Sequence, residues 1–409
     1  MPRVRLAYLT AHYPNVAHAF IQGEIFALER LGAEILRIAL NTPDPADIIS
    51  DDDRAEKAKT FYVKGTPKLL IAWRLSTITL CHPLAFTRCA LTALRAGGPN
   101  IGMGVKLVLQ LLEAMLVWRH CRRHGISAVH AHFGQAPASV ASLTTMFGNA
   151  VGREHWTWSA TIHGSHEFFN EDTSRVYEKI AHADLVVCIS DFTRAQLMRI
   201  ASPEDWPKIT IVRCGIDFNQ FAARPHRPSR YPPVIVTTAR LSREKGHLVL
   251  VEAVAILREL GVDVRVRMIG SGPFRDEIER AIMQHDVADV VDLTGPLPPD
   301  RVADELRDAD VFCLPTFFEG LPISIMEAMA IGVPVVTTYV GAIPELVVDG
   351  VTGWVVPAGN PHALVDAIRM AVIDQDEVVK AARAKVYESH DRVANVAELL
   401  PLLAACHRR

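Results

Sequence analysis

The chain has 409 residues, too many for one ordinary core, and its 49% hydrophobic and 22% charged residues are typical of globular proteins. A formal net charge of −3 disfavours general nucleic-acid binding, and seven scattered cysteines without a C-x-x-C pair disfavour a disulfide or metal framework. The first residues do not resemble a secretory signal, and we expect a cytoplasmic protein of at least two domains.

Apolar runs alternate with helical patterns along the first half of the chain, which predicts a parallel α/β sheet. Residues 42–60 are polar and predict a loop. The predicted strands are 4–9, 34–40, 128–131, 157–162, 184–189 and 209–213, and the predicted helices are 19–31, 66–96, 101–124 and segments from about 135 and 191 onward.

Two stretches of these helices, 68–94 and 102–118, are strongly apolar but interrupted by charged residues. Neither supplies the roughly 20 uninterrupted apolar residues of a spanning helix. They are either buried helices or an amphipathic surface over 68–118 that contacts a membrane.

The composition changes at residues 224–233, RPHRPSRYPP, which hold almost nothing apolar and predict an inter-domain linker. After the linker the alternation resumes. The predicted strands are 234–238, 264–269, 290–293, 311–314, 334–337 and 353–356, and the predicted helices are 246–260, 273–285, 299–308, 322–331 and 361–373.

We therefore expect two doubly wound, Rossmann-like domains that face a cleft, with ligands at the carboxyl ends of the strands. The expected divisions are an N-terminal domain over 1–223, the linker over 224–233, a C-terminal domain over 234–375, and helices over 376–409 that pack back on the first domain.

The stretch 315–332, PTFFEGLPISIMEAMAIG, follows a predicted buried strand and places two carboxylates around a helix start. Glu319 precedes the helix and Glu327 lies within it, while Pro322 suits a first helical position and Gly332 a left-handed cap. A helix N-terminus offers unpaired N–H groups and partial positive charge, so it can bind a phosphate. This pattern favours a site for a nucleotide-linked sugar.

Polar residues follow two other strands of the second half. Arg240 and Lys245 lie on the loop after 234–238, where they can neutralise a pyrophosphate or can be ordinary solvated cations at a helix start. Gly270 opens a Gly-Ser-Gly-Pro turn after 264–269, which permits close backbone approach to a ligand but also ends many strands.

Histidines at strand ends of the first half are candidates for chemistry. His163 follows strand 157–162 next to a glycine and is an active-site candidate, although a lone histidine is more often structural. We expect His130 and His132 to point to opposite faces of their strand, which disfavours a metal site. The acidic runs 51–53 and 308–310 are not placed at ligand-binding strand ends, so no metal ligands are predicted.

The motifs ARLSREKG, MIGSGPFRDEIE, EGLPISIMEAMAIGVPVVTT and GAIPELVVDGVTGWVVP, in this order over 234–360, resemble the retaining family 4 glycosyltransferases. Weaker matches in the first half are AFIQGEIFALERLGAE, VHAHFG, TIHGSHEF and CISDFTR. The combination is most similar to members assigned to exopolysaccharide and colanic-acid synthesis. The resemblance implies the GT-B fold.

The resemblance also implies that 1–223 is the acceptor-side domain and 234–375 the nucleotide-sugar-binding domain, and it implies roles by position. Glu319 is similar to the glutamate beside the donor sugar, Glu327 to the one that binds the ribose hydroxyls, and His163 to a histidine near the sugar and acceptor. Arg240 and Lys245 match the pair that stabilises the leaving diphosphate. The residues whose backbone N–H groups would approach the phosphates or sugar are Gly320, Leu321 and Ile323.

These roles imply retaining, metal-independent transfer of a hexosyl group from a nucleotide diphosphate sugar, of the UDP or GDP type, to a hydroxyl of a saccharide or lipid-linked saccharide. No cofactor is expected. The alternatives are a sugar-nucleotide epimerase on the same scaffold and a non-catalytic sugar-nucleotide-binding subunit.

Overall fold

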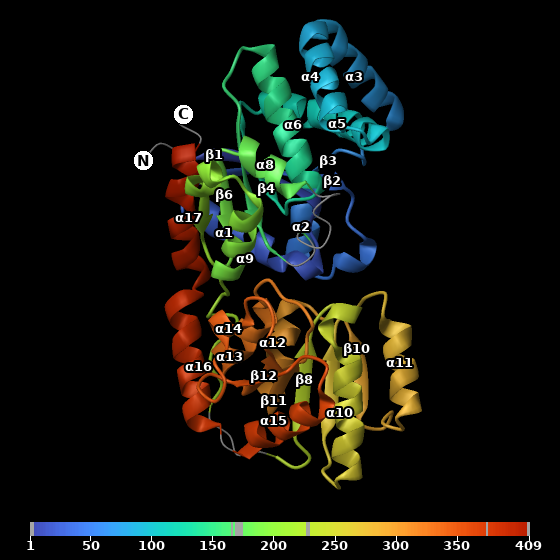
Figure 1. Cartoon of the computed structure of the whole chain (residues 1–409), viewed down its shortest axis with the longest axis vertical. Helices are drawn as coiled ribbons and strands as arrows, with labels where there is room; N and C mark the ends of the chain where they lie inside the picture. The colour runs from blue at the N-terminus through green and yellow to red at the C-terminus, as the bar shows by residue number, and fades with distance from the viewer. Residues whose placement is uncertain (1–3, 165–166, 168–174, 226–229, 374, 407–409) are drawn as a thin grey trace. The chain divides into compact units, whose positions relative to one another are not determined.

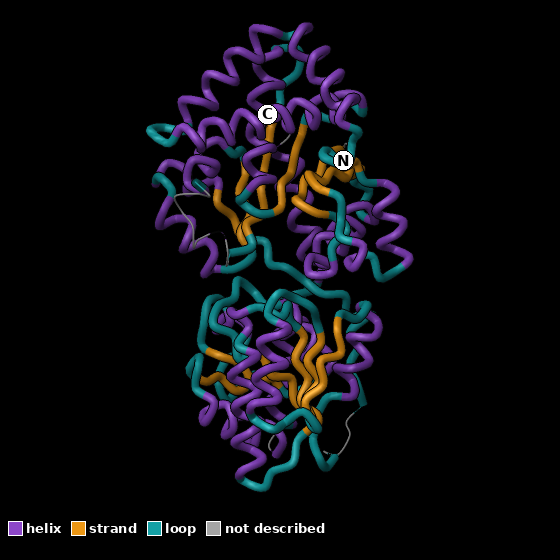
Figure 2. Tube along the Cα trace, turned by 90° about the vertical axis from the view of Figure 1, so that its right-hand side faces the viewer, coloured by secondary structure: helices purple, strands orange, loops and turns teal. Residues whose placement is uncertain are grey.

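The computed structural model describes residues 4–164, 167, 175–225, 230–373 and 375–406. The centre of the expected linker, 226–229, and the last residues, 407–409, lie outside the described residues. The chain folds as two compact units: unit 1 comprises Met1–Ile189, Thr193–Val212 and Val396–Arg409, and unit 2 comprises Ser190–Phe192 and Arg213–Asn395. Each unit has a parallel sheet covered by helices (Figures 1 and 2), so the expected doubly wound α/β fold is confirmed.

The sheet of unit 1 has seven strands in the order β3-β2-β1-β4-β5-β6-β7. Every pairing is parallel, and β4 and β5 are buried along their whole length. The strands are β1 (Arg5–His12), β2 (Glu34–Asn41), β3 (Phe61–Tyr62), β4 (Ala128–His132), β5 (Thr157–Ile162), β6 (Leu185–Cys188) and β7 (Ile209–Ile211).

Helices associated with unit 1 cover its sheet. They are α1 (Ala19–Arg30), α2 (Asp51–Lys59), α3 (Lys68–Cys81), α4 (Pro83–Ala96), α5 (Ile101–Arg123), α6 (Ala136–Val151), α8 (Val176–His182), α9 (Asp191–Ile200) and α17 (Arg392–Cys406). From Val396 onward α17 belongs to unit 1, and Leu399 and Leu403 join the buried cluster that contains Leu6 and Tyr8.

The loop expected over 42–60 is wrong, because residues 51–59 form helix α2. Its hydrophobic content is low, and a capping box starts it: Ser50 accepts from the N–H of Asp53, and the Asp53 carboxylate accepts from the N–H of Ser50. Glu56 is fully buried and accepts hydrogen bonds from Arg37 (2.9 Å) and Tyr13 (2.6 Å). Helix α2 is therefore held in place by its cap and by the buried Arg37–Glu56 ion pair, and not by an apolar face packed on the core.

The single helix expected over 66–96 is also wrong, because α3 and α4 are separate helices bent by 106° at His82. Pro83 occupies the first turn of α4, where a missing N–H costs nothing, but it cannot continue α3. Figure 1 shows both helices beside α5, which they contact.

Helix α5 is, by length and composition alone, apolar enough to cross a membrane, and α3 with α4 would pass the same test if the bent pair were one span. Its second half, from Leu111 to Cys121, lies in the core of unit 1. A core helix explains this apolar composition without a bilayer.

The sheet of unit 2 has six parallel strands in the order β10-β9-β8-β11-β12-β13. The strands are β8 (Val234–Thr238), β9 (Arg265–Ile269), β10 (Val291–Gly295), β11 (Val311–Leu314), β12 (Val335–Thr338) and β13 (Trp354–Val356). The helices are α10 (His247–Glu259), α11 (Arg275–Gln284), α12 (Pro299–Asp308), α13 (Ile323–Ile331), α14 (Ile343–Leu346), α15 (Pro361–Ile373) and α16 (Asp376–Ser389).

The strand order of unit 2 reverses between β8 and β11. From β8 the chain moves outward through β9 to β10, and from β11 it moves outward the other way through β12 to β13. Ligands of open α/β sheets bind outside the carboxyl ends of the strands at such a switch point.

Candidate active site

The loops that follow β8 and β11 carry the charged residues predicted for the site, and these strands are neighbours at the switch point. Arg240 and Lys245 lie on the first loop and Glu319 on the second. The loops bond directly to each other, since the carbonyl of Glu244 accepts the N–H of Phe317 (2.7 Å). Residues more than 70 positions apart are thereby held in one place.

Glycines permit the close packing of these loops. A Cβ built on Gly246 would lie 1.8 Å from the carbonyl oxygen of Pro315, and one on Gly270 would lie 2.0 Å from that of Ala239. Gly341, after β12, is equally tight, at 1.9 Å from the oxygen of Glu319. Four consecutive strand ends, β9-β8-β11-β12, therefore support one compact group of loops.

Lys245 and Glu319 form a mostly buried ion pair. The Nζ of Lys245 donates to Oε1 of Glu319 at 2.6 Å, and the side chains are 20% and 8% exposed. Arg240 is exposed, and Nε2 of the buried His247 donates to its backbone oxygen at 3.2 Å. His247 was not among the sequence-predicted residues; its buried position one residue after Gly246 shows that it supports the loop.

The N-terminus of α13 lies directly after Glu319. Pro322, the expected first helical position, is instead the N-cap, so the helix begins one residue later than expected, and no side chain caps it. The N–H of Ile325 donates to the carbonyl of Pro322 (3.2 Å), while those of Ile323 and Ser324 at the helix start are available to an anion, together with those of Gly320 and Leu321 in the preceding turn. Gly332 ends the helix in the left-handed conformation (φ +91°), as predicted.

Glu327 lies in the second turn of α13 and is half-buried. Burial raises the pKa of its carboxyl group to about 8, which the nearby charge of Arg392 only partly opposes. A mostly protonated carboxyl group can donate as well as accept a hydrogen bond, which suits a partner with hydroxyl groups.

In unit 1, His163 follows β5 and is buried. Its Nε2 lies 3.0 Å from Nδ1 of His132, and Nε2 of His132 lies 3.4 Å from Oε1 of Glu24. Tyr8 donates its hydroxyl to the same oxygen of Glu24 at 2.6 Å. Burial, with His132 and His18 nearby, holds the pKa of His163 well below its usual range, so the ring is neutral near pH 7.

The expectation that His130 and His132 point to opposite faces is wrong. Residues i and i+2 of a strand share a face, and the two rings are 5.1 Å apart. With Glu24 they bring potential ligand atoms within 4.8 Å of one another. The ring nitrogens of His130, however, lie 2.8 and 3.0 Å from the hydroxyls of Ser159 and Thr161, which fits a hydrogen-bonded core histidine better than a metal ligand.

Glu167 fixes the loop that carries His163. Its buried carboxylate accepts the N–H groups of His163 (2.8 Å), Gly164 (2.9 Å) and Gly134. Burial raises the pKa of Glu167 to about 7, against the opposing effect of these bonds and of Lys179. This carboxylate ties the loop after β5 to the loop after β4. Ser165 and His166 of the same motif lie outside the described residues.

The acidic runs have structural partners. Asp53 closes the capping box of α2, while Asp308 and Asp310 pair with Arg230 at 3.0 Å each. These contacts explain the positions of Asp53, Asp308 and Asp310.

Comparison with known proteins identifies the chain. Residues 80–220 match the model described as Glycosyltransferase Family 4, and residues 219–388 match the model described as Glycosyl transferases group 1. The fold is that of HepE from Anabaena, solved in complex with UDP-glucose, with a TM-score of 0.72 and 16% identity over 98% of this chain and 100% of that one.

Relatives named for polysaccharide synthesis align with most of the sequence. AmsK of Erwinia amylovora, an amylovoran biosynthesis glycosyltransferase, is 29% identical over 98% of this chain and 100% of its own. WcaL of Escherichia coli (strain K12), named for colanic acid biosynthesis, is 36% identical over 67% of this chain and 70% of its own. The chain is a family 4 glycosyltransferase with the GT-B fold.

Sequence reasoning singled out His163 of this glycosyltransferase but missed the residues that hold it. Glu167 stands in the same motif, TIHGSHEF, and its spacing of four residues from His163 was an available signal. Tyr8 on β1 and Glu24 on α1 lie more than 100 residues away, and only the packing of these two elements brings them to His132.

Replacing Gly341 by alanine should abolish donor binding by the glycosyltransferase. The added Cβ would displace the backbone at Glu319, as its 1.9 Å approach requires a shift of the loop. Gly350→Ala is the matched control, because Gly350 also has positive φ (+68°) but its Cβ would meet nothing within 4 Å. Titration of both variants with a nucleotide sugar checks this, and equal losses would show backbone strain alone to be responsible.

Replacing Glu327 by glutamine should stabilise the ligand-free glycosyltransferase at neutral and alkaline pH. Because folding raises the pKa of Glu327, the folded state keeps a proton that the unfolded state releases above pH ~4.3. The free energy by which this carboxyl group destabilises the fold therefore grows from that pH to about pH 8. For a half-buried group we expect a gain of about 1–2 kcal/mol at pH 8 and none at pH 4. Thermal unfolding across this range, with the exposed Glu252→Gln as control, measures it; a pH-independent difference would refute the titration.

Proposed function

We propose that this glycosyltransferase moves a hexosyl group from a nucleotide diphosphate sugar, of the UDP or GDP type, to a hydroxyl of a saccharide or lipid-linked saccharide in exopolysaccharide synthesis. Configuration at the anomeric carbon is retained and no metal is required. The relatives named for colanic acid and amylovoran synthesis support the pathway, and the UDP-glucose complex of HepE supports the donor class.

The observation that carries the proposal is the buried Lys245–Glu319 pair at the switch point of unit 2, immediately before the N-terminus of α13. The lysine and the helix terminus provide positive charge for a diphosphate. The glutamate provides a carboxylate directly beside that position, where the sugar attached to the diphosphate would lie. A plain phosphate site would not need this carboxylate.

The proposed reaction breaks the bond between the anomeric carbon and the β-phosphate oxygen and forms a bond to the acceptor oxygen. Negative charge develops on the departing diphosphate, and Lys245, Arg240 and the first N–H groups of α13 stabilise it electrostatically. These groups supply the charge that a divalent ion supplies in other transferases. The proton of the acceptor hydroxyl goes to the departing phosphate in an internal-return route, or to a base after Glu319 forms a covalent intermediate.

The remaining donor contacts are assigned by position. Glu327 would bind the ribose hydroxyls, for which its raised pKa makes it both donor and acceptor. From unit 1, His163 would contact the transferred sugar or the acceptor as a neutral ring. The backbone groups proposed to approach the phosphates or sugar are Gly270, Gly320, Leu321 and Ile323.

Thermal unfolding with a panel of nucleotide sugars tests the donor, since a ligand at 100 times its dissociation constant adds about 2.7 kcal/mol. NMR of the anomeric proton of the product tests retention, and activity in the presence of EDTA tests metal independence. Isomerisation of the donor without acceptor would instead indicate an epimerase, and no shift with any nucleotide would contradict the proposal.

We further propose that the enzyme works in the cytoplasm at the inner face of the membrane, which it contacts through residues 68–118. Large apolar side chains of α3, α4 and α5 are exposed: Leu69 (88%), Leu80 (80%), Leu84 (80%) and Ile101 (80%). Over 68–123 the sequence has eight lysines and arginines and one acidic residue, Glu113. An apolar surface with excess positive charge suits an anionic lipid surface.

A further inference from the structure

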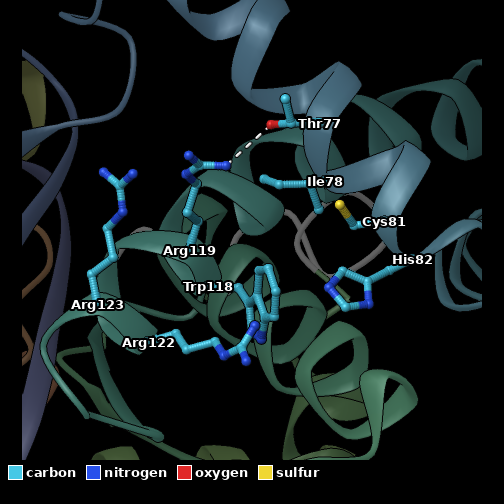
Figure 3. Close-up of a pocket in the computed structure, with 8 residues that line it drawn as sticks. All are labelled: Thr77, Ile78, Cys81, His82, Trp118, Arg119, Arg122 and Arg123. Atoms are coloured by element: carbon cyan, nitrogen blue, oxygen red, sulfur yellow. Dashed lines mark hydrogen bonds between the residues drawn. The ribbon is translucent and has the colours of Figure 1, made fainter.

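A pocket of about 380 Å³ opens in unit 1 between the end of α3 and the last two turns of α5 (Figure 3). Three arginines of α5 line one side, and the polar residues of α3 and of the following corner line the other. The lining residues include Thr77, Cys81, His82, Arg119, Arg122 and Arg123.

The pocket is separate from the candidate active site of unit 1. Helix α5 ends at Arg123, and the chain then enters β4 at Ala128, so the pocket lies toward the amino ends of the strands. His163 follows the carboxyl end of β5, a parallel neighbour of β4. The two sites therefore lie at opposite ends of the strands of the same sheet.

Among the described residues, only one of the three pocket arginines has an acidic partner. Arg119 donates to the hydroxyl of Thr77 at 3.1 Å, as Figure 3 shows, and its Nε is buried without a hydrogen bond. Arg122 has only Glu154 at 3.9 Å, and no described carboxylate pairs with Arg119 or Arg123. Burial and the neighbouring arginines lower the pKa of Arg119, yet a guanidinium stays charged.

A buried hydrogen-bond donor without an acceptor loses its hydration without compensation. Nε of Arg119 is such a donor, and the partly buried Arg122 and the exposed Arg123 line the same pocket, so these guanidinium groups favour an anionic ligand. Planar guanidinium groups match phosphate oxygens in particular.

The rim of the pocket is apolar. Cys81 and His82, which line it, are flanked in sequence by Leu80 and Leu84, both 80% exposed. Trp73 is also exposed, and the guanidinium of Arg119 lies 5.6 Å from the centre of its ring. A soluble anion would not need apolar side chains at its entrance, whereas a lipid brings acyl chains next to its phosphate.

We propose that this pocket binds the phosphate of an anionic membrane lipid, while Leu80, Leu84 and Trp73 enter the adjacent lipid surface. The assignment rests on the membrane contact proposed above and adds a specific headgroup site to it. The site orients unit 1 at the membrane and takes no part in the transfer reaction.

Binding of the full chain to vesicles tests the proposal, with phosphatidylglycerol in phosphatidylcholine compared with phosphatidylcholine alone. Arg119→Gln and Arg123→Gln should each weaken binding to the anionic vesicles by at least about tenfold. Arg88→Gln on the exposed face of α4 is the matched control, and loss of one surface charge should cost no more than about fivefold. Equal losses in all three variants would overturn the pocket in favour of a general surface charge.

A second experiment distinguishes a lipid headgroup from free phosphate as the ligand of the pocket. Inorganic phosphate or glycerol 1-phosphate should shift the NMR signal of the Arg119 side chain in the wild type and in the Leu80→Ser/Leu84→Ser double variant, whereas that variant should lose vesicle binding. If phosphate binds but wild-type vesicle binding shows no preference for anionic lipid, the lipid assignment is refuted. Donor binding is measured alongside and should be unchanged in the arginine variants, so failure of the proposed transferase function would be seen separately.

Discussion

Replacing Glu319 by glutamine is expected to lower turnover by about 10²–10³-fold while leaving the donor bound at least as tightly as in the wild type. Glutamine keeps the shape of the side chain but removes the charge that faces the developing positive charge of the sugar. It also releases Lys245 from its 2.6 Å contact, and the freed ammonium group can then contact the diphosphate more closely. Single-turnover kinetics and donor titration measure the two quantities separately.

Two variants complete this experiment. Glu252→Gln, an exposed carboxylate on α10, should leave both quantities unchanged. Glu327→Ala should weaken donor binding more than it lowers turnover, because its assigned contact is the ribose. Intact turnover in Glu319→Gln, with a loss of donor affinity equal to that of Glu327→Ala, would contradict the assigned roles.

The second large effect is expected at His163, where alanine should reduce turnover by about 10²-fold or more. Nε2 of His132 lies 3.4 Å from Oε1 of Glu24 but makes no hydrogen bond within the described part of the chain, so Glu24 does not decide which ring donates in the 3.0 Å contact between His132 and His163. If Nε2 of His163 donates in this contact, Nδ1 of His163 is left as an acceptor. That nitrogen could accept a hydroxyl proton of the sugar or acceptor.

Glu24→Gln tests the contribution of this carboxylate without removing a ring. It takes the negative charge away from His132 and should lower turnover less than His163→Ala does, because both rings stay in place, while donor binding is unchanged. The exposed His155→Ala is the control and should be silent. Full activity in Glu24→Gln would show that His163 acts without Glu24.

The doubly wound fold was predictable because its signals are local. Buried parallel strands appear as short apolar runs, and the bounds predicted for β5, β8 and β11 agree with the structure. Helix α2 was missed because its stability comes from the capping box and the buried Glu56, neither of which gives an apolar period. The bend between α3 and α4 was missed because both helices are apolar and only Pro83 marks the boundary.

The candidate site was predictable to the level of loops but not of contacts. Strand–loop–helix patterns place Arg240, Lys245 and Glu319 at carboxyl ends of strands. The Lys245–Glu319 pair additionally requires that β8 and β11 be neighbours, and sequence order does not specify this. The partners of His163 depend in the same way on the adjacency of β1, β4 and β5.

The course of α17 determines how this enzyme can be dissected. The hydrophobic residues Val396, Leu399 and Leu403, at the end of the sequence, complete a core whose other members, such as Leu6 and Ile25, come from its beginning. A recombinant fragment that stops at residue 212 would therefore expose the face that α17 covers and should aggregate. Supplying residues 392–406 as a fused or added helix should restore the solubility of this fragment. The two units can therefore be produced separately only if the fragment of unit 1 includes α17.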